Sequence, residues 1–156
     1  MRHELRLFLI ALQFLTRVPV PAWVGWRDDW MNQSARHVPL VGAFVGAFAA
    51  LVVWGAAHLW SALVAVLLSM VATVWLTGAF HEDGLADTCD GLGGAVSKQR
   101  VLEIMKDSRL GTYGTLGLLA VLAVLALKAA ALAGLAARDL AATLALLVLL
   151  ALLSRG

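Results

Sequence analysis

The chain has 156 residues, of which 62% are hydrophobic and only 14% are charged. Because a soluble domain averages about 25% charged residues, this composition excludes an ordinary soluble protein and indicates an integral membrane protein. The net charge of +2 is too small to indicate nucleic-acid binding, and the single cysteine, Cys89, excludes an intramolecular disulfide.

The first 37 residues are expected to lie at a membrane surface. Residues 4–15 are apolar but too short to span a bilayer, so they predict an interfacial helix with Arg2 and Arg6 near lipid headgroups. Residues 22–37 are predicted to be a polar loop. Three tryptophans in this loop indicate an interfacial belt or, alternatively, a stacking platform for a flat ligand: Trp23, Trp26 and Trp30.

Four apolar runs follow. The first, residues 38–59, contains Gly42-x-x-x-Gly46, a small-residue face that suits close helix packing. The second, residues 62–80, comes after a short join, so the two predict an antiparallel hairpin. The other runs are residues 111–133 and 139–153. The prediction is an all-α, polytopic membrane bundle of about four spans plus the N-terminal interfacial helix.

We treat the chain as a single membrane domain in four parts. These are an N-terminal interfacial segment, a hairpin, a cytoplasmic catalytic segment and further spans: residues 1–37, 38–80, 81–110 and 111–156. Arginine and lysine gather in the first and third parts, which an even number of spans separates. Both parts are therefore expected in the cytoplasm, with residues 134–138 outside.

The polar segment after the second run opens with His81 and a series of acidic residues. Asp83, Asp87 and Asp90 are spaced i, i+4 and i+7, so on a helix they fall within about 60° of arc. Three like charges so close favour a bound cation, and oxygen-only ligands favour Mg²⁺. The alternative is a solvated acidic helix start, stabilised by the helix dipole.

Residues 97–107 predict a short helix with Ser97 as its N-cap, followed by a loop rich in glycine and hydroxyl groups. Arg109 can hold a phosphate through two hydrogen bonds, and Asp107 adds an oxygen ligand. A metal, an arginine and a glycine loop together indicate phosphoryl or phosphodiester transfer. The alternative is a helix C-cap and a turn into the next span. His81 is either a base or a marker of the membrane boundary.

Residues 80–91 and 102–112, together with residues 14–21, resemble the cobalamin synthase (adenosylcobinamide-GDP ribazoletransferase) family. The resemblance implies a multi-pass enzyme of the bacterial inner membrane that requires Mg²⁺. It would join α-ribazole, or its 5′-phosphate, to adenosylcobinamide-GDP and release GMP, with adenosylcobalamin or its phosphate as the other product.

The resemblance also implies roles for individual residues. The metal ligands would be four aspartates: Asp83, Asp87, Asp90 and Asp107. The groups that hold phosphate oxygens would come from the loop: Ser108, Arg109, Gly111 and Thr112. Either Asp90 or His81 would take the proton from the attacking hydroxyl. The expected partners are the two substrates and the lipid bilayer, without nucleic acid, and a homo-oligomer is left open.

Members of that family are longer, so we expect this chain to correspond to an N-terminal portion. It should then have little or no activity unless it forms a homo-oligomer or receives the missing segment. One alternative is a CDP-alcohol phosphotransferase-like enzyme, whose pattern fails here because Asp87 follows Ala86. The other is a transporter or scaffold, which predicts ionisable groups deep in the membrane. Lys128 lies near a span end and can snorkel.

Overall fold

The computed structural model describes residues 2–94, 97–107 and 109–153 of the chain. Within these residues the structure is all-helical and contains no strand, which confirms the predicted class. Two helical stretches, Asp28–Ala56 and Thr112–Ala136, are long and apolar enough to span a membrane. A third span exists if Ala62–Thr77 and Phe80–Gly94, separated by a short break, count as one. The predicted number of four spans stays a prediction.

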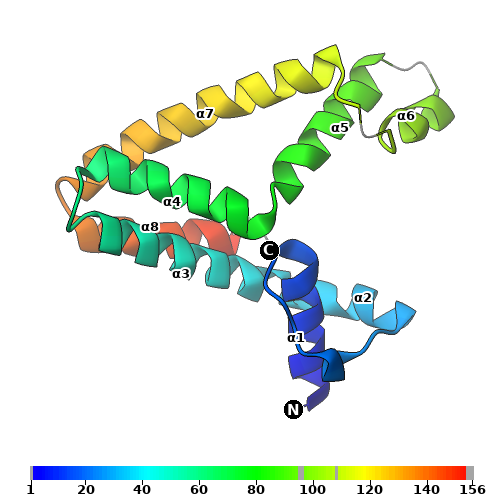
Figure 1. Cartoon of the computed structure of the whole chain (residues 1–156), viewed down its shortest axis with the longest axis horizontal. Helices are drawn as coiled ribbons and strands as arrows, with labels where there is room; N and C mark the ends of the chain where they lie inside the picture. The colour runs from blue at the N-terminus through cyan, green and yellow to red at the C-terminus, as the bar shows by residue number, and fades with distance from the viewer. Residues whose placement is uncertain (1, 95–96, 108, 154–156) are drawn as a thin grey trace. The chain divides into compact units, whose positions relative to one another are not determined.

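The chain divides into two compact units, of which one comprises Met1–Gly78 with Ala129–Gly156 and the other Ala79–Lys128. The first unit contains α1 (Arg2–Leu15), η1 (Ala22–Val24), α2 (Asp28–Ser34), η2 (Ala35–His37), α3 (Val38–Ala56), α4 (Ala62–Thr77) and α8 (Leu140–Leu153). The second contains α5 (Phe80–Gly94), α6 (Lys98–Ile104) and most of α7 (Thr112–Ala136), as Figure 1 shows. The prediction of a single membrane domain is not tested by this division.

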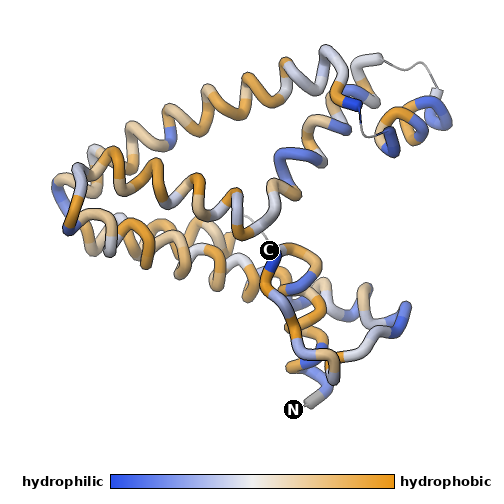
Figure 2. The backbone as a smooth tube through the Cα atoms, viewed as in Figure 1, coloured by the Kyte–Doolittle hydropathy of each residue, from blue (hydrophilic) through white to orange (hydrophobic). Residues whose placement is uncertain are grey.

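The two units differ in the polarity of their helices. In Figure 2, α3, α4 and α8 are hydrophobic over most of their length, whereas α5 and α6 carry several hydrophilic residues. Hydrophobic surface all round a helix suits lipid or a buried position. Of these three helices, α3 belongs to a stretch that is long enough to span a membrane, whereas α8 is a shorter apolar helix.

The hairpin predicted from the first two apolar runs is confirmed, because α3 and α4 lie side by side (Figure 1). The hydroxyl of Ser69 in α4 donates a hydrogen bond of 3.1 Å to the carbonyl oxygen of Ala49 in α3. A buried hydroxyl bonded in this way links two apolar helices without an unsatisfied polar group.

The small-residue face of α3 also packs as predicted, and its partner is α8 (Figure 1). A Cβ atom added at Gly46 would lie 2.8 Å from the Cα of Val148 and 2.9 Å from the carbonyl oxygen of Leu147. Only glycine therefore allows the two backbones to come this close.

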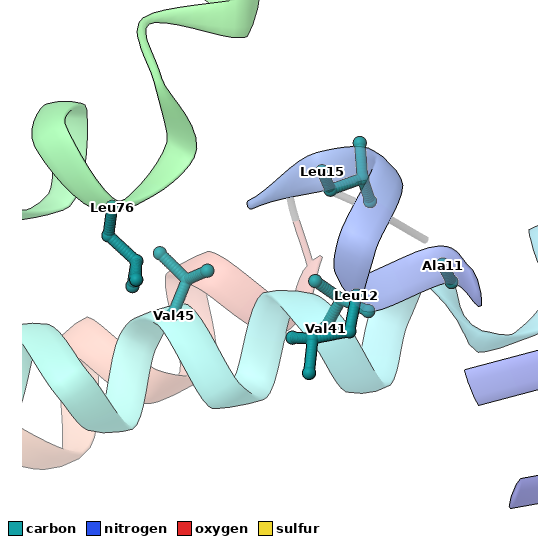
Figure 3. Close-up of a cluster of buried hydrophobic side chains, with 6 residues drawn as sticks. All are labelled: Ala11, Leu12, Leu15, Val41, Val45 and Leu76. Atoms are coloured by element: carbon teal, nitrogen blue, oxygen red, sulfur yellow. The ribbon is translucent and has the colours of Figure 1, made fainter. Parts of the chain in front are cut away.

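The N-terminal helix α1 packs part of its apolar face against protein. Figure 3 shows one buried cluster in which residues of α1 meet residues of α3 and α4: Ala11, Leu12, Leu15, Val41, Val45 and Leu76. The carboxylate of Glu4 accepts hydrogen bonds from Arg36 at 2.7 Å and His37 at 3.2 Å. Protein thus covers part of the apolar face, whereas Leu5 and Phe14 stay about half exposed, and the position of α1 at the membrane interface stays a prediction.

The loop predicted for residues 22–37 was wrong for residues 28–37, because α2 runs through η2 into α3. Asp28 and Asp29 lie in the first turn of α2, where the helix dipole favours negative charge. The guanidinium of Arg6 lies 5.9 Å from the ring centroid of Trp23 and 5.8 Å from that of Trp30. These cation–π contacts occupy two of the three tryptophans, and the choice between a belt and a stacking platform stays open.

The second apolar run ends at Thr77 rather than at the predicted residue 80. Gly78 adopts the left-handed conformation with φ of 67°, which ends α4, and Ala79 also has a positive φ of 59°. The backbone N–H of Arg17 donates to the carbonyl oxygen of Leu76 at 2.8 Å and satisfies the end of α4. The acidic segment therefore forms a helix of its own.

Candidate functional site

Helix α5 presents the acidic residues, and its formation confirms the helical spacing predicted for them. Asp83 and Asp87 lie one turn apart and line a cavity of about 210 Å³ together with Ala86. Asp90, one further turn along, is not among the residues that line this cavity. Of the three aspartates predicted to share one face, two therefore line the cavity, whereas Asp90 is buried elsewhere in the second unit.

The rest of the cavity wall comes from α6 and the residues after it: Met105, Lys106, Asp107, Arg109 and Leu110. Ser97 caps α6 as predicted, because its hydroxyl accepts a hydrogen bond of 3.3 Å from the N–H of Arg100. Gly91 of α5 allows α6 to approach, since a Cβ there would lie 2.9 Å from the Cγ of Met105 and 3.1 Å from the Cγ1 of Val101.

Asp107 and Arg109 form a local ion pair at the cavity. The N–H and the Nε of Arg109 donate to Oδ1 of Asp107 at 3.1 and 3.0 Å, and Nη2 donates to Oδ2 at 2.5 Å. The side-chain hydrogen bonds from Arg109, and then its backbone N–H, lower the pKa of Asp107 from 3.8 to about 2. Asp107 is therefore ionised at neutral pH.

Asp90 is buried, with 9% of its surface exposed, and its carboxylate binds the start of α7. Oδ2 accepts the N–H of Gly111 at 2.7 Å, and Oδ1 accepts the N–H of Gly114 at 2.8 Å. The first N–H groups of a helix lack partners within it, so Asp90 satisfies two of them. The N–H of Gly111, predicted to meet substrate phosphate, is thus bound to Asp90.

Glycines make this contact between α5 and α7 close enough to form. A Cβ added at Gly111 would lie 2.8 Å from Cγ of Asp90, and one at Gly114 would lie 2.9 Å from the same atom. A Cβ at Gly117 would lie 2.7 Å from Sγ of Cys89. Residues 111, 114 and 117 recur every three positions, on one side of a helix. This regular spacing was a signal of close packing that sequence reasoning missed.

The remaining predicted site residues are placed as follows. His81 is exposed, makes an edge-to-face contact with Phe80 at 5.6 Å between ring centroids, and does not line the cavity. Thr112 is exposed and begins α7. Ser108 lies outside the described residues. Lys106, which lines the cavity, was missed, although it directly precedes Asp107.

A three-aspartate metal cluster does not form in the described part of the chain, where no group of three or more His, Cys, Asp or Glu side chains is placed to hold an ion. The carboxylates that share the cavity are Asp83, Asp87 and Asp107. Together with Lys106 and Arg109 they make a small site of mixed charge, which suits an anion accompanied by a cation.

Comparison with known proteins gives a family match over residues 7–156, to the family described as cobalamin-5-phosphate synthase. A curated relative from Leptothrix cholodnii, named adenosylcobinamide-GDP ribazoletransferase, is 74% identical over 111 residues, which are 71% of this chain and 42% of the relative. Relatives of the same name from Shewanella amazonensis and Vibrio cholerae are 54% and 51% identical, each over 72% of this chain and 43% of the relative.

The chain thus spans about 43% of the length of these curated relatives. No solved structure matches it. The family match does not favour the CDP-alcohol phosphotransferase or the transporter interpretation.

Proposed function

Because the chain belongs to the cobalamin-5-phosphate synthase family, we propose that it takes part in the reaction for which its relatives are named, adenosylcobinamide-GDP ribazole transfer. In this reaction a hydroxyl of α-ribazole, or of its 5′-phosphate, attacks the phosphorus attached to cobinamide. GMP leaves, and adenosylcobalamin or its phosphate is formed. The observation that carries the proposal is the cavity, which combines acidic residues of α5 with Lys106, Asp107 and Arg109.

Mg²⁺ fits this cavity even without a cluster of three carboxylates. Mg²⁺ keeps several waters and is often held by one or two carboxylates together with substrate phosphates. Asp83 and Asp87 would supply these carboxylates, with Asp107 as a further oxygen donor. When bound, the ion would neutralise charge on a diphosphate. Lys106 and Arg109 would hold phosphate oxygens, because both are cations at the cavity wall.

Of the two proton acceptors expected from the sequence, His81 is favoured. Both carboxylate oxygens of Asp90 accept backbone N–H groups, so Asp90 would have to give up a hydrogen bond to take a proton. An imidazole can accept a proton near neutral pH. His81 is exposed at the first turn of the same helix.

The proposed location is the inner membrane, with residues 81–110 facing the cytoplasm. Support comes from the apolar helices and from the gathering of arginine and lysine before residue 37 and between residues 98 and 109. In a background with Cys89→Ala, an impermeant thiol reagent outside the cell should label a cysteine placed at Arg138 and leave one at Lys98 unlabelled. The reverse pattern would contradict this orientation.

The activity itself is tested by GMP release from adenosylcobinamide-GDP and α-ribazole, with and without Mg²⁺. The assay is run on this chain alone and with the C-terminal portion of the Leptothrix relative added. We expect Mg²⁺-dependent release with the added portion and little without it. Asp87→Asn should raise the Mg²⁺ concentration for half-maximal rate about tenfold or more, because it removes a charged ligand. Asp139→Asn is the matched control, since Asp139 caps α8. Absence of release in both arrangements would refute the proposal.

A further inference from the structure

We propose that Asp90 is a positioning residue, which holds the first turn of α7 on α5 and so fixes residues 105–107 and 109–111 beside Asp83 and Asp87. It takes neither metal nor proton in this role. The inference rests on the proposed function of the cavity, but the contacts that carry it belong to the second unit alone.

The carboxylate of Asp90 is bound to the start of α7. Asp90 is a buried carboxylate whose two oxygens are each bonded to a backbone N–H, at 2.7 and 2.8 Å, and these groups lie 21 and 24 residues further along the chain. Hydrogen bonds from N–H groups to an ionised acceptor are about twice as strong as neutral ones. The positive end of the α7 dipole adds to the attraction. This is a strong tie between two helices.

Gly91, next to Asp90 in α5, contacts α6 and the residue after it. Gly91 packs against Val101 and Met105, at the end of α6, while Asp90 holds Gly111 and Gly114. Two adjacent residues of α5 therefore attach a segment, the described residues 105–107 and 109–111, at Met105 and at Gly111. That segment carries the cationic wall of the cavity, Lys106 and Arg109.

The acidic residues of the cavity, Asp83 and Asp87, belong to the same helix as Asp90. Asp87 lies one helical turn before Asp90 on the same rigid helix. The contacts of Asp90 and Gly91 with this segment therefore set the distance between the carboxylates of α5 and the cations Lys106 and Arg109. A displacement of about 1 Å in such a site is enough to weaken binding or catalysis strongly.

The test uses the whole chain in lipid nanodiscs and three measurements: amide hydrogen exchange at residues 111–114, binding of Mn²⁺ alone, and binding of inorganic pyrophosphate with Mn²⁺. The variants are Asp90→Asn, Asp87→Asn and Asp139→Asn. Asp139 is the matched control, because its Oδ1 accepts the N–H of Ala142 at 2.9 Å at the start of α8. It tests the loss of a helix cap away from the second unit's cavity.

In Asp90→Asn, exchange at residues 111–114 should rise about tenfold or more, because an amide presents only one oxygen. Affinity for Mn²⁺ alone should stay within about twofold, while affinity for pyrophosphate should fall about tenfold. Asp87→Asn should show the opposite pattern, with Mn²⁺ binding lost and exchange unchanged. Asp139→Asn should change neither exchange at residues 111–114 nor binding of either probe.

A second variant guards against a general folding defect in Asp90→Asn. Gly111→Ala keeps the charge of Asp90 but places a Cβ against its carboxylate, so exchange at Gly114 should rise and pyrophosphate affinity should fall in the same way. Loss of Mn²⁺ binding in Asp90→Asn together with unchanged exchange would overturn the inference and make Asp90 a ligand. Normal pyrophosphate affinity in both variants would also overturn it while leaving the proposed function standing. Binding of neither probe by the unchanged chain would instead contradict the metal and phosphate roles proposed for the cavity, and with them the inference.

Discussion

Glycine brings helices together in both units, but the atoms it brings together are different. In the first unit, Gly46 lets the backbone of α8 approach the backbone of α3. In the second unit, Gly111 and Gly114 let the carboxylate of Asp90 reach the N–H groups at the start of α7. The same sequence signal, small residues at helical spacing, therefore marks a dispersion contact in one place and a charged hydrogen bond in the other.

The forces that stabilise the two units differ accordingly. The first unit contains buried apolar clusters, one of which joins α3, α4 and the end of α7: Val53, Ala56, Ala65, Val66, Ala129 and Leu132. In the second unit, hydrogen bonds to the buried carboxylate of Asp90 join α5 to the start of α7, and Arg109 forms a local ion pair with Asp107. Packing in the first unit should respond to changes in volume, whereas the second should respond to changes in charge and pH.

The largest effect is expected for Gly46→Ala. The new Cβ would meet backbone atoms of α8, which cannot move aside cheaply, so the free energy of unfolding should fall by about 1–3 kcal/mol. Gly55→Ala is the control in the same helix, because a Cβ there meets nothing within 4 Å. It should be neutral or stabilising by up to about 1 kcal/mol. Thermal unfolding in detergent measures both, and equal stability of the two variants would contradict the tight α3–α8 contact.

A smaller effect is expected for Gly114→Ala in the second unit. Here the new Cβ meets the end of a side chain, the carboxylate of Asp90, which can turn away at the cost of one hydrogen bond. The lost bond and the gain in helix propensity partly cancel, so the net loss should be about 1 kcal/mol. Gly134→Ala in the same helix, with open space around it, is the control. A larger loss of free energy of unfolding in Gly114→Ala than in Gly46→Ala would contradict this expected order.

The smallest effect concerns the ionisation of Asp107. Its pKa is lowered to about 2, mainly by the side-chain hydrogen bonds from Arg109, so the ion pair is complete above pH 3.8 and is lost as the pH falls through about 2. Arg109→Gln should move the pKa of Asp107 back towards 3.8. Titration of the ¹³C-labelled carboxyl by NMR measures this change. A pKa that stays at about 2 in the variant would show that another group lowers it.

The sequence by itself determined the helical class, the apolar runs, the helix that carries the aspartates and the cap at Ser97. These properties are local, because hydrophobic composition, i, i+4 spacing and cap residues act within a few turns of chain. It also carried the family resemblance, since the motifs in residues 80–91 and 102–112 are contiguous.

The tertiary structure decided which partner each surface meets. Periodicity placed Asp90 on the acidic face of α5, but only the fold shows that its oxygens are bound to Gly111 and Gly114, whereas Asp83 and Asp87 line the cavity. It likewise showed that α8 covers Gly46, about a hundred residues further along the chain. Helical spacing specifies the direction in which a side chain points, and the group it meets depends on contacts between distant segments that no local pattern encodes.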